Sequence, residues 1–151
     1  MLRSVFHTSW TVADLDRSVA FYRDLLGFEV TGQRERQGEA IETVVGFPDA
    51  DLRIAFLKIP GAPLGPSNHH LELIEYRHPK GTKLTVRTCD PGSAHLALET
   101  DSIAEDCRRL RAAGVAIVSD PVAFSGGAAG NVLACYLRDP DGFTIELVQI
   151  G

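Results

Sequence analysis

Apolar and polar residues recur along the first half of the chain in a pattern that predicts one helix and several short strands. Residues 5–12 alternate closely enough for a half-buried strand. After Asp14, which is placed to cap a helix, apolar residues follow at spacings of four, three and four, at Leu15, Val19, Tyr22 and Leu26. Gly27 is expected to end this helix, and further strands are expected at 28–30, 52–59 and 71–76.

The second half of the chain repeats this order of elements. Residues 95–100 have the pattern of a strand, and Asp101 or Ser102 is placed to cap the helix that follows. Two more strands are expected at 132–137 and 143–149.

Short sequence matches between the halves indicate an internal duplication. Phe56-Leu57-Lys58 parallels Tyr136-Leu137-Arg138, and Leu71-Glu72-Leu73 parallels Ile145-Glu146-Leu147. We therefore expect an α+β fold of two tandem βαβββ modules, which form a curved eight-stranded cup with helices outside. The modules are expected to pair because one alone would bury too little apolar surface. Their expected bounds are 1–76 and 93–151, with a linker at 77–92.

The composition excludes several classes of function. The 151 residues are 44% hydrophobic and 23% charged, which is the balance of a folded globular protein. The formal net charge of −5 disfavours nucleic acid as a partner, and no run of 18 apolar residues is present to span a membrane. The three cysteines form no CxxC pair, which is typical of reduced thiols in the cytoplasm. We therefore expect a cytoplasmic protein.

The duplication gives two histidines and two glutamates equivalent positions. His7 and His95 lie on the first strand of each module, and Glu72 and Glu146 lie on the last. Because residues i and i+2 of a strand share a face, the apolar neighbours of these four residues point away from them. Imidazole and carboxylate suit first-row divalent ions such as Ni, Zn, Co, Mn and Fe. The sequence therefore predicts one metal site that leaves positions free for a substrate oxygen.

The same residues lie in motifs that resemble those of the vicinal oxygen chelate superfamily, which includes glyoxalase I, methylmalonyl-CoA epimerase, extradiol dioxygenases and the bleomycin resistance proteins. The resemblance covers nearly the whole chain. It rests on His7-(x)6-Asp14-Leu15, Phe21-Tyr22-Arg23-Asp24-Leu25-Leu26-Gly27-Phe28, Leu71-Glu72-Leu73, Ala94-His95-Leu96-Ala97 and Asp139-Pro140-Asp141-Gly142-Phe143-(x)2-Glu146-Leu147. The resemblance implies that the metal-ligand positions of the glyoxalase and epimerase branch correspond in this chain to His7, Glu72, His95 and Glu146. The resemblance also implies a homodimer and a small-molecule substrate.

Glu at position 72 makes the ligand pattern closest to glyoxalase I and, next, to the epimerases. The resemblance thus implies a metal-dependent lyase or isomerase that acts by proton transfer through a metal-stabilised enediolate. Its substrate would be a small carbonyl compound, thioester or hemithioacetal, with Glu146 as the catalytic base and Glu72 as its counterpart. Two alternatives remain, namely an Fe(II) extradiol-type dioxygenase and a non-catalytic protein that binds a drug or metabolite.

Three further residues are candidates for the substrate pocket. Ser9 shares a strand face with His7, and His70 shares one with Glu72. His70 could instead simply be the residue at which a strand begins, with no role in the pocket. Glu42 lies in the long segment after the second strand, where it is either a second base or an exposed side chain.

Arg34 and Arg36, and likewise Lys83 and Arg87, could hold an anionic substrate, but such side chains are usually only solvated. Arg34 and Arg36 alternate with acidic residues, Glu35 and Glu39, and this pattern favours solvated side chains.

Overall fold

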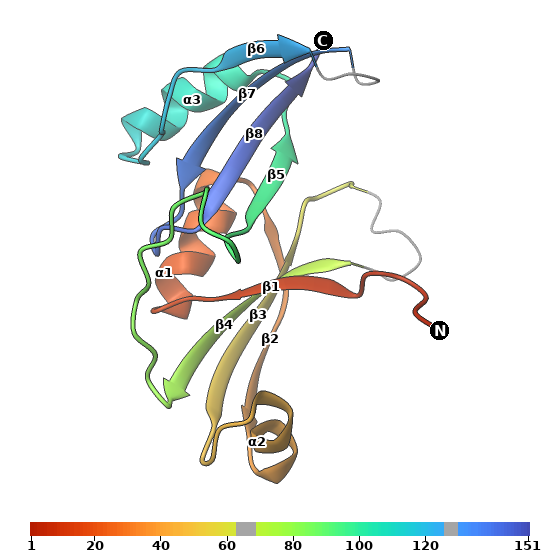
Figure 1. Ribbon diagram of the computed structural model, residues 1–151, viewed down its shortest axis with the longest axis vertical. Coiled ribbons are helices and arrows are strands. Elements are labelled where there is room, and N and C mark those ends of the chain that lie inside the picture. Colours follow the sequence, from red (N-terminus) through yellow and green to blue (C-terminus); the bar gives the residue numbers. More distant parts are fainter. Residues whose placement is uncertain (63–68, 126–129) are drawn as a thin grey trace. The chain divides into compact units, whose positions relative to one another are not determined.

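The chain divides between Lys83 and Leu84 into two units, Met1–Lys83 and Leu84–Gly151. The structure is a computed structural model that describes residues 1–62, 69–125 and 130–151. Within these ranges each unit has one four-stranded sheet of the same strand order (Figure 1). The predicted α+β class and the tandem modules are therefore confirmed. The finer bounds 1–76, 77–92 and 93–151 stay a prediction.

The first unit orders its strands β1-β4-β3-β2. The edge strand β1 (His7–Thr11) runs parallel to β4 (His70–His78). β3 (Asp51–Lys58) pairs antiparallel with both β4 and β2 (Glu29–Gln37). The first and last strands of the module are therefore hydrogen-bonded neighbours, although more than 50 residues of sequence lie between them.

The helix α1 (Leu15–Ala20) begins where the sequence predicted. The side chain of Asp14 accepts a hydrogen bond from the backbone N–H of Arg17 at 3.0 Å, which caps the first turn. The helix continues as a wider turn of π-helix, η1 (Phe21–Leu25), in which the consecutive aromatic residues Phe21 and Tyr22 are both buried.

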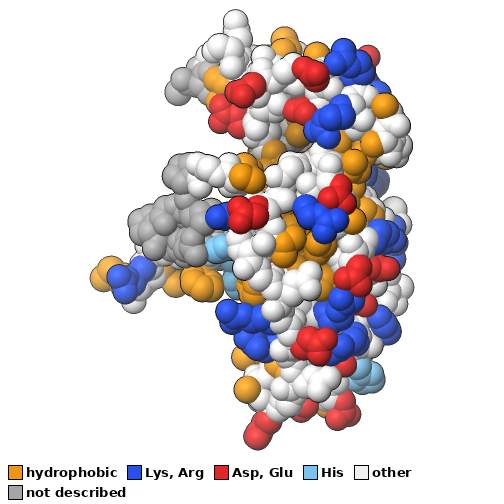
Figure 2. Space-filling view, turned by 180° about the vertical axis from the view of Figure 1, so that it is seen from behind, with side chains coloured by type: hydrophobic (Ala, Val, Ile, Leu, Met, Phe, Trp, Pro, Cys, Tyr) orange, Lys and Arg blue, Asp and Glu red, His pale blue; other side chains and the backbone are white. Residues whose placement is uncertain are grey.

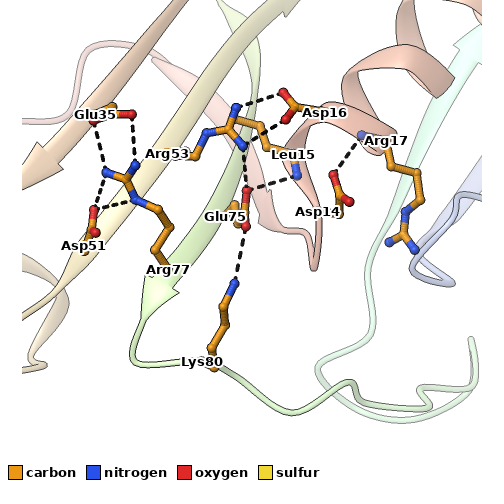
Figure 3. Close-up of polar contacts among 10 residues, drawn as sticks. All are labelled: Asp14, Leu15, Asp16, Arg17, Glu35, Asp51, Arg53, Glu75, Arg77 and Lys80. Carbon is orange, nitrogen blue, oxygen red and sulfur yellow. Dashed lines mark hydrogen bonds and ion pairs between the residues drawn. The ribbon is translucent and has the colours of Figure 1, made fainter.

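Two side chains of the sheet hold α1 in place. Arg53 on β3 donates to Asp16 at 2.8 Å and to Glu75 on β4 at 3.2 Å. Glu75 also accepts from the backbone N–H of Leu15 at 3.3 Å, and Lys80 lies 3.4 Å away from it (Figure 3). The odd-numbered residues of β3 and β4 therefore face α1.

The helix α2 (Glu39–Val45) was not predicted from the sequence. It lies between β2 and β3, and ends at Gly46, whose φ of +75° is favourable only for glycine. None of its residues is buried, and Phe47, just beyond it, contacts the ring of Tyr76 edge-on at 6.3 Å. The first unit thus departs from the βαβββ order by one added helix.

The second unit repeats the topology of the first, with the order β5-β8-β7-β6. β5 (His95–Glu99) runs parallel to β8 (Thr144–Ile150), and β7 (Asn131–Arg138) pairs antiparallel with both β8 and β6 (Val122–Ser125). The sequence pattern did not locate β6, because its four residues are all exposed.

The helix α3 (Ile103–Ala112) packs against the second sheet through Ile103, Cys107 and Leu110. Ser102, one of the two predicted residues, is at the N-cap position, but its side chain makes no capping hydrogen bond. The sulfur atoms of the free thiols Cys107 and Cys135 lie 3.3 Å apart, and burial raises the pKa of Cys135 to about 12. Since Cys135 lies on β7, the odd-numbered residues of β7 face α3.

Basic and acidic side chains are interspersed over the face drawn in Figure 2. Ion pairs also join the strands of the first sheet: Arg77 contacts Asp51 at 2.6 Å and Glu35 at 3.0 Å (Figure 3). Hydrogen bonds from Arg77 and then from Gln37 hold the pKa of Asp51 below its ordinary value. Within the described ranges, no helix is long and apolar enough to cross a membrane.

Candidate metal centre

His7 and Glu72 form a close pair in the first unit. Because β1 and β4 are parallel and in register, Ser9 lies beside Glu72, and His7 lies two residues before Ser9 on the same face. The Nε2 atom of His7 is 3.3 Å from Oε2 of Glu72, with side-chain exposures of 37% and 10%. Trp10 lies on the opposite face, where its ring contacts Tyr22 at 5.7 Å. The pair therefore lies on the face away from α1, which we call the site face of the first sheet.

His95 and Glu146 form the same pair in the second unit. Here β5 and β8 are parallel and place Ala97 beside Glu146, with His95 two residues before Ala97. The Nε2 atom of His95 is again 3.3 Å from Oε2 of the glutamate, and the side chains are 47% and 19% exposed. The two pairs are thus built in one way, as the duplication predicts.

An aromatic residue lies across from each glutamate. Phe56 on β3 is the cross-strand neighbour of Glu72, and Tyr136 on β7 is that of Glu146. The ring of Tyr136 also lies 5.6 Å from the imidazole of His95. The sequence comparison of the two halves identified Phe56 and Tyr136 as equivalent residues, but it did not assign either of them to the site. The strand register supplies that assignment.

The geometry of each pair fits two ligands of one ion. Donor atoms that each lie about 2.1 Å from an ion, at angles between 90° and 109°, are about 3.0–3.4 Å apart. The N–O distance of 3.3 Å in both pairs falls in this range, and each imidazole is solvent-accessible. Taken over the described residues, no three His, Cys, Asp or Glu side chains are grouped as ligands of an ion. Each unit thus contains one His–Glu pair whose spacing is compatible with two ligands of an ion.

The three predicted pocket residues lie in different surroundings. Ser9 is exposed on β1 beside Glu72. His70 is half-buried at the start of β4, with its ring 6.4 Å from that of Phe56. Glu42 is half-buried on α2, and none of the polar contacts among the described residues joins it to the His7–Glu72 pair. The structure thus places Ser9 and His70, but not Glu42, on the strands of the pair.

The second unit also contains a hollow of about 460 Å³ at its sheet edge. Phe124, Val132, Leu133 and Gln149 contribute to its lining, together with the C-terminal Gly151. Neither His95 nor Glu146 belongs to this lining, so the hollow is separate from the candidate metal ligands.

Comparison with known proteins gives a consistent picture. The family model of the Glyoxalase/Bleomycin resistance protein/Dioxygenase superfamily matches residues 4–147. A 2-epi-5-epi-valiolone epimerase from an Actinomyces species is 30% identical over 151 residues, covering 97% of this chain and 79% of the relative. A lactoylglutathione lyase from Salmonella typhimurium is 30% identical over 147 residues, with coverages of 96% and 91%.

Solved structures show the same fold. A glyoxalase family protein from Bacillus cereus has a TM-score of 0.83 at 22% identity and covers 99% of this chain and 95% of its own. The trypanothione-dependent glyoxalase I of Leishmania major has a TM-score of 0.67 at 26% identity, with coverages of 98% and 87%.

Proposed function

Because the chain belongs to the Glyoxalase/Bleomycin resistance protein/Dioxygenase superfamily, we propose that it is a metal-dependent lyase or isomerase that transfers a proton on a small carbonyl compound. One observation supports this most strongly. The same His–Glu pair, 3.3 Å apart, lies on corresponding strands of both units. In both units the imidazole is solvent-exposed, so packing of the core does not account for the pair. Relatives named as a lyase and as an epimerase support the reaction class.

The proposed ligands of the ion are His7, Glu72, His95 and Glu146, each histidine through Nε2 and each glutamate through one carboxylate oxygen. This mixed nitrogen and oxygen set suits Ni, Zn, Co, Mn or Fe and does not single out one of them. A divalent ion bound there would polarise the oxygens of the substrate and make the neighbouring C–H group more acidic.

The two glutamates differ in exposure, and this suggests different roles. The side chain of Glu146 is 19% exposed and that of Glu72 is 10% exposed, so Glu146 is the better placed to reach a substrate. Glu146 would accept the proton from a carbon next to a carbonyl group and return it to the adjacent carbon. Glu72 would deliver the proton on the opposite face in an epimerase. The neighbouring Phe56 and Tyr136 rings would limit the access of water to these carboxylates.

Metal titration tests the proposed site. Protein stripped with a chelator is titrated with Ni²⁺, Zn²⁺, Co²⁺, Mn²⁺ and anaerobic Fe²⁺, and binding is followed by calorimetry and by the melting temperature. We expect one ion per chain, and an affinity at least about tenfold weaker in both His7→Ala and His95→Ala. The matched control is His78→Ala, which removes an exposed histidine at the end of β4. Absence of binding, or loss of affinity in only one of the two variants, would contradict a shared four-ligand site.

Turnover assays separate the proposed reaction from the two alternatives. Oxygen uptake with catechols by the Fe²⁺-loaded protein would assign it to the dioxygenases. Stabilisation by a metabolite without metal and without turnover would identify a binding protein.

A further inference from the structure

Arg34 is a cation on the site face of the first sheet. The register aligns Gly32 on β2 with Phe56 on β3 and Phe56 with Glu72 on β4, so these three residues share a face. Arg34 lies two residues beyond Gly32 and therefore has the same orientation. In agreement, its guanidinium carbon lies 5.5 Å from the centre of the Phe56 ring. Arg34 and Glu72 thus lie on either side of one aromatic ring.

The acidic neighbours of Arg34 in the sequence do not neutralise it. Glu35 is the next residue of the strand, so it points to the opposite face, where it accepts from Arg77 at 3.0 Å. Glu39 lies beyond the strand, at the start of α2. Arg34 has no carboxylate partner among the described residues, whereas Arg53 and Arg77 contact two each. This is unexpected in a chain with a net charge of −5.

The other carboxylates on the strands of this face already have basic neighbours. Glu29 lies 3.5 Å from Lys58, and Glu72 lies 3.3 Å from His7. Arg36 lies two residues beyond Arg34 on the same face of β2. Within the part of the chain that the structure describes, it donates only to the backbone carbonyl of Glu35, at 3.2 Å. Among the described residues, neither Arg34 nor Arg36 therefore contacts a carboxylate, so both guanidinium groups are available to an anion.

The second unit shows that the fold does not require a cation at this place. In the register of β6 with β7, Val122 pairs with Ala134, just as Arg34 pairs with Ile54 in the first unit. Val122 is 58% exposed and makes the corresponding position apolar. A cation at this position is therefore specific to the first unit and is not part of the repeated βαβββ architecture.

We propose that Arg34 binds an oxyanion group of the substrate, a carboxylate or a phosphate, and so makes the protein selective for anionic substrates. The planar guanidinium presents a fork of donors that matches these groups, and its position over the Phe56 ring orients the fork. Two strand spacings separate β2 from β4, so the anionic group would lie about 10 Å from the oxygens held near Glu72. This inference rests on the proposed function.

A pair of probes that differ in one charge tests the inference. Suberic acid monohydroxamate and its methyl ester both present two neighbouring oxygens to a metal, but only the acid carries a carboxylate at the far end. With Ni²⁺-loaded protein, we expect calorimetry to give about tenfold tighter binding of the acid, the effect of a hydrogen bond to a charged group. Arg34→Met should abolish this preference, and Arg34→Lys should retain part of it.

The matched control is Arg108→Met, which removes an arginine whose side chain is 77% exposed on α3 and should leave the preference unchanged. Normal Ni²⁺ affinity of the Arg34→Met protein would show that it is folded. Equal affinity of the native protein for both probes, or a preference that survives in Arg34→Met, would overturn the inference.

A second measurement is independent of metal. The Nε–H resonance of Arg34 is assigned by its absence in Arg34→Met, and the metal-free protein is titrated with suberate and with inorganic phosphate. A saturable shift with one of them supports an oxyanion site and identifies the preferred group. No shift with either refutes the site, even where a failure to bind metal has already refuted the proposed function.

Discussion

The ring of Tyr136 lies 5.6 Å from the imidazole of His95, tilted by 44°. Tyr136 is also the cross-strand neighbour of Glu146, so a single aromatic side chain lies beside both members of the proposed ligand pair. A bulky neighbour restricts the rotamers of both side chains, and ligands that are held in place before binding lose less entropy when an ion arrives.

We therefore expect Tyr136→Leu to weaken metal binding by about tenfold, the lower end of the effect of residues that orient metal ligands. Tyr136→Phe keeps the ring and removes only the hydroxyl, so its metal affinity should be close to that of the native protein. Calorimetric titration of the metal-free variants measures both. An equal loss in the two variants would show that the hydroxyl, and not the ring, supports the site.

Replacing each glutamate by glutamine tests the two carboxylate roles. Glu146→Gln should lower turnover at least about a hundredfold, because an amide cannot accept the proton, while metal affinity falls by less than about tenfold. Glu72→Gln should lower turnover to a similar extent only if the product is protonated on the opposite face, as in an epimerase. Rates measured at saturating metal decide between the two reaction types. Full activity of Glu146→Gln would contradict its role as the base.

The sequence predicted the modules well, because their core strands alternate strongly between apolar and polar residues. The strand predicted at 71–76, for example, is present as His70–His78. The superfamily resemblance is confirmed by the family model. The cytoplasmic location, the homodimer and the shared metal site stay predictions.

Elements without buried residues could not be predicted in this way. The helix Glu39–Val45 and the strand Val122–Ser125 have no buried residue and are only seven and four residues long, so their few apolar residues make too short a pattern to identify either element. Periodicity also assigns residues to a face without saying which strands are neighbours. For this reason the positions of Phe56 and Tyr136 beside the glutamates, and of Arg34 across the ring from Glu72, required the strand register.

The contact between Arg53 and Glu75 should contribute measurably to stability. The side chain of Glu75 is only 12% exposed and would lose its main cation in Arg53→Met. Of its described partners, this would leave the backbone N–H of Leu15 at 3.3 Å and Lys80 at 3.4 Å. We expect the free energy of unfolding to fall by about 2 kcal/mol. Arg108→Met breaks an exposed ion pair on α3 and should cost less than about 0.5 kcal/mol. Urea denaturation of both variants makes the comparison, and equal losses would contradict this role of Glu75.

Stability should also decrease in acid through Asp51. Hydrogen bonds from Arg77 and then from Gln37 lower its pKa in the folded protein from the ordinary 3.8. A lowered folded pKa adds stability above the unfolded pKa, and this contribution is lost as the pH falls through the folded value. The loss should therefore begin near pH 4 and continue below it. In Asp51→Asn the slope of stability against pH below about pH 4 should be smaller, whereas the exposed Asp101→Asn should retain it.

The buried thiols should be unreactive in the folded protein. Burial, and then the hydrogen bond with Cys107, raise the pKa of Cys135 to about 12, so almost no thiolate forms at neutral pH. Cys107 is buried against it, while Cys89 is exposed. We expect a disulfide reagent such as DTNB to modify one thiol per chain under native conditions and three in guanidinium chloride. Cys89→Ser should reduce the native count to zero, and rapid modification of a second thiol would show that α3 separates readily from β7.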